Sequence, residues 1–92
     1  MARVNKKMKV SGKQVAAARE LLGLTQVELA KAAGVSDMTI ANFETGKSEP
    51  QRATLEKILA ELDRRGIEFT NGTGTGVRLD HAKAEQYVKS QK

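Results

Sequence analysis

The sequence lacks cysteine, which excludes a disulfide framework and a thiolate metal site. Its single histidine, His81, excludes a histidine-rich metal site and has no partner of the kind a catalytic triad needs. We therefore expect no metal, no cofactor and no enzymatic activity. No apolar run approaches the ~18 residues of a membrane span, and the charged N-terminus lacks the apolar core of a signal peptide. These absences predict a cytoplasmic protein without membrane contact.

Positive charge is in excess but unevenly placed. The 92 residues carry a net charge of +5, which favours a polyanionic partner, usually nucleic acid. Residues 1–24 contain six basic residues and one acidic residue, whereas residues 25–46 contain one basic residue and three acidic residues. Non-specific attraction to phosphate must therefore come from the flanks of residues 25–46.

Residues 25–46 have the signals of two helices joined by a tight turn. Thr25 followed by Glu28 is a capping box, which starts a helix at Gln26. Gly34 stands where the chain must take a left-handed conformation, and Ser36 can cap a second helix. Two helices joined so closely must cross at a steep angle.

The residues expected at this crossing are small or apolar. Ala30 permits close approach, Val35 fills the angle between the helices, and Ile40 and Phe43 mark the inner face of the second helix. The alternative interpretation is an ordinary helical hairpin in a small bundle.

With these features the chain resembles the helix-turn-helix proteins of the lambda repressor and Cro type, the XRE family. The resemblance runs from about Ser11 to Leu62 and includes LGLTQVELAKAAGVSDMTIANFETGKSEP. It implies a mainly α fold, with four to five short helices and a helix-turn-helix. It also implies sequence-specific binding of double-stranded DNA by a transcriptional regulator, which we expect to repress rather than to activate. Members commonly bind as homodimers whose reading helices lie about one DNA turn, ~34 Å, apart.

The same resemblance suggests which residues meet DNA. The candidates for base edges lie on the outer face of the helix at about 37–45 and are Asp37, Met38, Ala41 and Asn42. Asp37 has an alternative role, as a carboxylate interacting with the helix dipole. The candidates for phosphate contact or support are Gln26, Ser36, Thr39, Thr45, Lys47 and Arg52. For Lys47 and Arg52 the alternative is two exposed cations.

A structural ion pair is also implied by the family. Arg19 lies beside the buried stripe of the first helix, and family members pair this arginine with a glutamate that here is Glu44. The alternative is two solvated charges.

The chain divides into three regions. Residues 1–10 form a basic segment, either a flexible arm tracking a DNA groove or a disordered tail. Residues 11–66 form the helix-turn-helix domain, with a first helix at Gly12–Leu22 and a fourth from Gln51 to Arg65. The fourth helix has a strong apolar stripe, suited to the core or to a dimer interface, and a solvated face with Glu61, Arg64 and Arg65.

At the start of the third region, residues 67–92, the spacing of apolar residues changes from the helical pattern to alternation with polar residues. Alternation predicts a small C-terminal β-hairpin that pairs Ile67 with Leu79 and Glu68 with Arg78. Because a lone hairpin is marginal in water, it must pack on the helices or at a dimer interface. Asp80 can cap a short last helix, for which the signal is poor.

A second hypothesis belongs to another class of function. The acidic balance of residues 25–46 and the poor hydrogen-bonding capacity of Met38 and Ala41 are compatible with a protein-interaction module, such as an antitoxin-like or adaptor protein.

Overall fold

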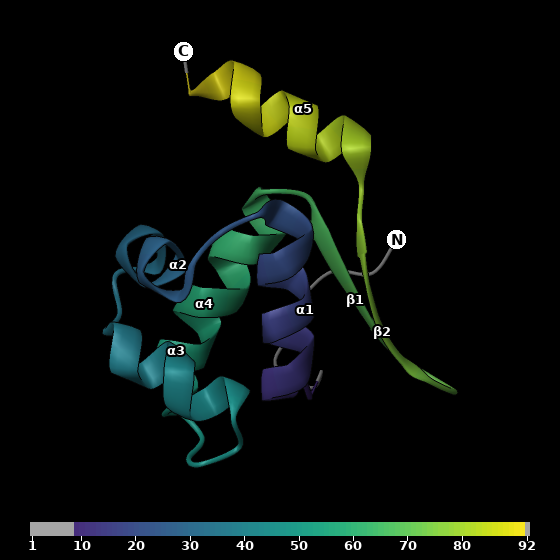
Figure 1. Cartoon of the computed structure of the whole chain (residues 1–92). Helices are drawn as coiled ribbons and strands as arrows, with labels where there is room; N and C mark the ends of the chain where they lie inside the picture. The colour runs from purple at the N-terminus through teal and green to yellow at the C-terminus, as the bar shows by residue number, and fades with distance from the viewer. Residues whose placement is uncertain (1–8, 92) are drawn as a thin grey trace.

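The computed structural model describes residues 9–91 and shows a helical bundle with a hairpin on one side (Figure 1). Within that range the helices are α1 (Gly12–Leu22), α2 (Gln26–Ala33), α3 (Asp37–Glu44), α4 (Arg52–Arg64) and α5 (His81–Ser90). The strands are β1 (Ile67–Asn71) and β2 (Thr75–Leu79), which pair antiparallel. The fold is mainly α, as the sequence predicts.

The helix boundaries follow local capping chemistry. The Thr25 hydroxyl accepts from the Glu28 amide at 3.0 Å, and the Glu28 carboxylate accepts from the Thr25 amide at 2.8 Å, so the predicted capping box is present. Gly34 ends α2 with a φ of 75°, in the left-handed region. Ser36 caps α3, whose last helical residue is Glu44 rather than the predicted Thr45.

One apolar core joins the first four helices to the hairpin. Val15, Leu29, Ile40 and Ile58 are fully buried, so each of α1 to α4 contributes to it. Phe69 on β1 is 1% exposed and extends the same core into the hairpin. The apolar stripe of α4 is therefore used mainly for the core.

The hairpin has the predicted register and packs beside α1 (Figure 1). Ile67 is opposite Leu79, and Glu68 is opposite Arg78, with a 3.3 Å ion pair between the latter two. Gln14 on α1 is 4% exposed and its side-chain amide donates to the Gly76 and Thr70 carbonyls at 2.9 and 3.3 Å. This buried amide ties the hairpin to the bundle.

Two features differ from the sequence-based picture. Glu61 was expected on a solvated face and is 6% exposed, so that prediction is wrong. Its two carboxylate oxygens each accept at 2.6 Å, one from Arg64 and one from Arg65, so the buried charge is paired. Val10, at the end of the predicted arm, is 3% exposed and belongs to the core. Residues 1–8 of the arm lie outside the described residues.

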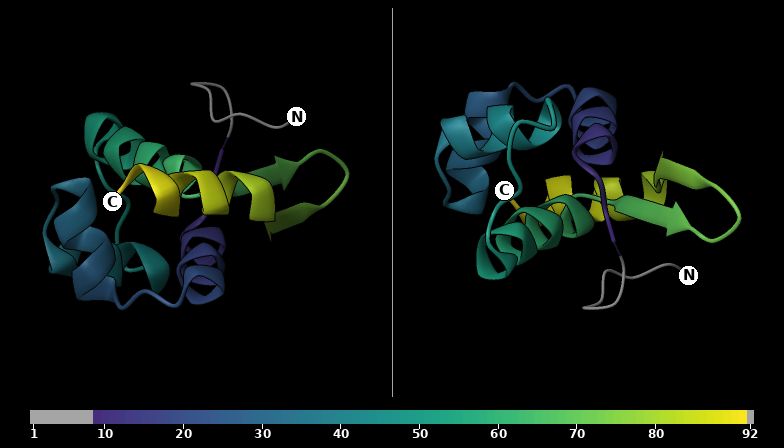
Figure 2. Two further views of the ribbon diagram at one scale, coloured as in Figure 1. Left: turned by 90° about the horizontal axis from the view of Figure 1, so that it is seen from above. Right: turned by 90° about the horizontal axis from the view of Figure 1, so that it is seen from below.

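The last helix forms with Asp80 as its cap. The Asp80 carboxylate accepts from the Lys83 amide at 3.1 Å, and this bond lowers the pKa of Asp80. Nevertheless, α5 contains no buried residue. It lies on the opposite side of the bundle from α3, and Figure 2 shows it crossing above α4.

Candidate nucleic-acid interface

The outer face of α3 is open to solvent. The inner residues Ile40 and Phe43 are 0% and 5% exposed, which fixes the rotation of the helix about its axis. Met38, by contrast, is 63% exposed. Asp37 is also exposed, while Ala41 and Asn42 are half-buried. All four candidates for base contact therefore share one accessible side of a helix that the core holds rigidly.

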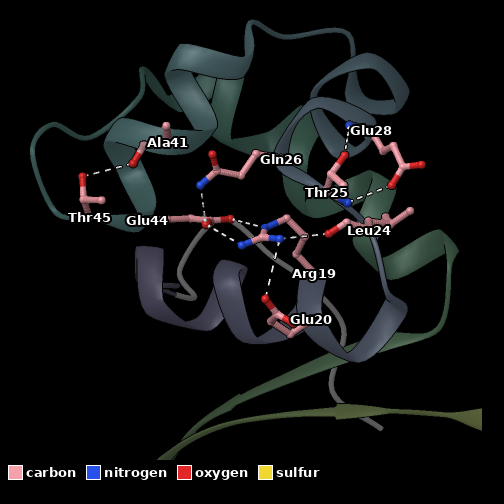
Figure 3. A network of polar contacts seen from close by, with 9 residues as sticks. All are labelled: Arg19, Glu20, Leu24, Thr25, Gln26, Glu28, Ala41, Glu44 and Thr45. Carbon is pink, nitrogen blue, oxygen red and sulfur yellow. Dashed lines mark hydrogen bonds and ion pairs between the residues drawn. The ribbon is translucent and has the colours of Figure 1, made fainter.

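A bidentate ion pair fixes the C-terminal end of α3 to α1 (Figure 3). The Arg19 guanidinium donates to the two Glu44 carboxylate oxygens at 2.8 and 3.0 Å and to the Leu24 carbonyl at 2.9 Å. The predicted contact is thus present, and the two side chains are only 15% and 6% exposed. The hydrogen bond with Glu44 raises the pKa of Arg19.

Gln26 joins the same network from the start of α2. Its amide nitrogen donates to a Glu44 oxygen at 2.9 Å (Figure 3). The bond holds the Gln26 side chain between α2 and α3, which is the geometry a supporting residue needs.

The hydroxyl groups near α3 are occupied within the helix ends. Ser36 accepts from the Thr39 amide at 3.1 Å, and the two hydroxyls share a further bond at 2.8 Å. Thr45 donates to the Ala41 carbonyl at 3.0 Å (Figure 3). Asp37 accepts from the Met38 amide at 3.0 Å. Each group has a local structural role, and contact with DNA stays a prediction for all of them.

A hollow of about 300 Å³ lies beside the outer face of α3. Met38, Thr39 and Asn42 form one wall, and the loop between α3 and α4 with the first turn of α4 forms the other. The residues that sequence reasoning missed are in this second wall, namely Ser48, Glu49, Pro50, Gln51 and Thr54. Pro50 could have indicated this second wall from the sequence, because a turn at the proline brings the start of α4 beside α3.

The candidate cations stand at the edge of this region. Lys47 is exposed in the loop after α3. Arg52, at the start of α4, is also exposed and forms a 3.4 Å ion pair with Glu56, one turn further along. Gln51, which caps α4, makes no side-chain bond to the helix start.

Across residues 9–91, no three histidine or acidic side chains come together in a way that could hold a metal ion. Within the same range, no helix has the length and apolar character needed to cross a membrane.

Comparison with known proteins gives two matches to this region. A family model described as "Helix-turn-helix" matches residues 15–69, more than half of the chain. A curated protein of Haemophilus influenzae (strain ATCC 51907 / DSM 11121 / KW20 / Rd), named "Uncharacterized HTH-type transcriptional regulator", is 38% identical over 52 residues. The match covers 56% of this chain and 53% of the relative, so the chain spans about half the length of that protein. The capped helices, the glycine turn and these matches together show that the chain belongs to the helix-turn-helix family of the XRE type.

Proposed function

We propose that this chain binds double-stranded DNA sequence-specifically and acts as a transcriptional regulator, with α3 in the major groove. The observation that carries the proposal is the accessible face of α3, because its inner side is packed in the core while Met38 is 63% exposed. The printed name of the Haemophilus relative, an HTH-type transcriptional regulator, supports the same class of function.

Each reading residue has a base that suits its chemistry. The Asn42 amide can donate to and accept from adenine N6 and N7 together, and Met38 and Ala41 suit contact with thymine methyl groups. Asp37 only accepts, so cytosine N4 is its one favourable base partner. Lys47 and Arg52, with Gln26 and the hydroxyl residues, hold the phosphate backbone and set the register.

The regulator works as a non-enzymatic repressor in the cytoplasm and binds as a homodimer. A symmetric pair would place two copies of α3 on half-sites about one DNA turn, roughly 34 Å, apart. A repressor needs only to occupy DNA, and no other activity is required of the chain.

Selection of bound duplexes from a random DNA pool at near-physiological salt tests the proposal. We expect enrichment of a palindrome with half-sites about one turn apart. Asn42→Ala should relax base preference at one position of each half-site, at a cost of about 1–3 kcal/mol. Gln86→Ala, which removes an exposed amide from α5 on the opposite side, should leave the selected sequence unchanged.

Identical selected sites for the wild type and Asn42→Ala would remove Asn42 from the reading residues. The outcome against the whole proposal is binding with no enriched sequence. That result would favour the second candidate, a protein-interaction module, for which the acidic balance of residues 25–46 is the supporting observation. A single enriched half-site would contradict the homodimer and leave the reading helix intact.

Lys47 offers a separate electrostatic prediction. If Lys47 contacts a phosphate, Lys47→Gln should weaken binding equally for all sequences and reduce the slope of log K against log salt by about 1. Lys89→Gln removes an exposed charge from α5 and serves as the control, with no change in slope expected. Titrations at several salt concentrations measure both, and equal slopes for the two variants would remove Lys47 from the interface.

A further inference from the structure

A second, larger hollow lies between the C-terminal half of α4 and one face of α5. Its volume is about 640 Å³, within the ~300–1,000 Å³ range of small-molecule sites. Arg64 and Asp63 line it from α4, and Lys83 and Tyr87 line it from α5. The proposed binding of DNA by α3 makes no use of it.

Polar contacts hold the two walls of this hollow together. The Asp80 amide donates to the Gly66 carbonyl at 2.8 Å and anchors the start of α5. Further along, Lys83 pairs with Asp63 at 3.4 Å, and the Arg64 guanidinium carbon lies 5.1 Å from the centroid of the Tyr87 ring. No residue of α5 is fully buried, and Tyr87 is half-buried at the hollow.

The chemistry of the walls selects an anion with a flat apolar body. Arg64 and Lys83 put two cationic groups at the hollow, and their side chains are 54% and 32% exposed. Tyr87 and the aliphatic stems of the two cations offer apolar surface for a ring. Asp63 adds one negative charge, which disfavours a ligand with several.

We infer that the hollow between α4 and α5 binds a small aromatic carboxylate, with the carboxylate at Arg64 and Lys83 and the ring beside Tyr87. The two cations are already paired, Arg64 with Glu61 at 2.6 Å and Lys83 with Asp63 at 3.4 Å, so the ligand carboxylate accepts from their remaining N–H groups. Because α5 and α3 lie on opposite sides of the bundle (Figure 1), the ligand does not block the DNA-reading face. This site goes beyond the proposed function and stands whether or not DNA is bound.

The test is an NMR titration of the full chain with 1-naphthoate, followed through backbone amide signals. We expect saturable shifts confined to the second half of α4 and to α5, with the α3 signals unchanged. The neutral analogue 1-naphthalenemethanol has the same ring without the charge and should bind about fivefold more weakly, the upper end of the range for loss of a partly exposed ion pair.

Two variants locate the charge contacts independently. Arg64→Gln and Lys83→Gln should each weaken 1-naphthoate binding about fivefold. Lys57→Gln removes an exposed lysine of α4 outside the hollow and should leave it unchanged. Absence of shifts in α4 and α5, equal binding of the neutral analogue, or equal binding by both hollow variants and Lys57→Gln would overturn the inference.

Discussion

Replacing Arg19 with methionine will destabilise the fold by about 2–3 kcal/mol. Without the guanidinium, the Glu44 carboxylate keeps only the Gln26 amide among its present partners, in a site where its side chain is 6% exposed. Breaking a fully buried pair costs about 3–5 kcal/mol, and the surviving hydrogen bond makes this case milder. Against a total stability of about 5–15 kcal/mol for a domain, the loss is large.

The double-mutant cycle with Glu44→Leu separates pairing from packing. We expect Arg19→Met/Glu44→Leu to be more stable than Arg19→Met alone, because no charge is then left buried without its partner. Urea unfolding followed by circular dichroism gives the free energies of unfolding of the wild type, the two single variants and the double variant. Simple addition of the two single effects would show that the residues act independently.

An exposed ion pair provides the matched control. Arg52 and Glu56 are 48% and 45% exposed and lie 3.4 Å apart. Glu56→Gln should therefore change the free energy of unfolding by less than about 0.5 kcal/mol. A similar loss in Glu56→Gln and Arg19→Met would mean that burial contributes nothing to the strength of the Arg19 contact.

Replacing Gly12 with alanine will cost about 2–3 kcal/mol through overpacking. Gly12 is the first residue of α1 and lies directly against the end of α3. A Cβ atom there would be 1.8 Å from the Phe43 carbonyl oxygen and 3.1 Å from the Glu44 Cα. Both are backbone atoms, so one helix must move. Alanine ordinarily stabilises a helix interior relative to glycine by about 1 kcal/mol, so the expected sign is reversed by this contact.

Gly72 is the control for Gly12. It lies in the hairpin loop, where an added Cβ would have nothing within 4 Å, so Gly72→Ala should stay within about 0.5 kcal/mol of the wild type. Thermal unfolding of both variants measures the difference. A Gly12→Ala protein as stable as the wild type would show that α1 and α3 can separate without loss.

The sequence predicts those parts of the fold that depend on local chemistry. Thr25, Glu28 and Ser36 set helix starts through bonds to amides within one turn, and such bonds can be read from spacing alone. The hairpin register follows from alternation, because a shift by one residue would turn Phe69 away from the core. The ion pair of Arg19 and Glu44 came from family resemblance, since the two are 25 residues apart.

Features that depend on how distant elements pack were not predictable. Glu61 lies off the apolar stripe of α4, and its burial with both oxygens bonded to Arg64 and Arg65 depends on how the side chains pack. The contact of Gly12 with α3 depends on the crossing distance of two helices, which no local pattern reveals. Gln51 and Thr54 form a wall beside α3, and a second hollow lies between α4 and α5. Each hollow depends on how two elements pack, so the sequence of one element alone does not predict it.

The position of Tyr87 determines what the intrinsic fluorescence of this protein reports. The chain has one tyrosine and no tryptophan, and that tyrosine sits on α5 with the Arg65 guanidinium carbon 4.7 Å from its ring centroid. Tyrosine emission therefore reports whether α5 is packed against α4, and this contact is remote from α3. A fluorescence melt that precedes the loss of circular dichroism would mark the release of the last helix from a bundle that is still folded.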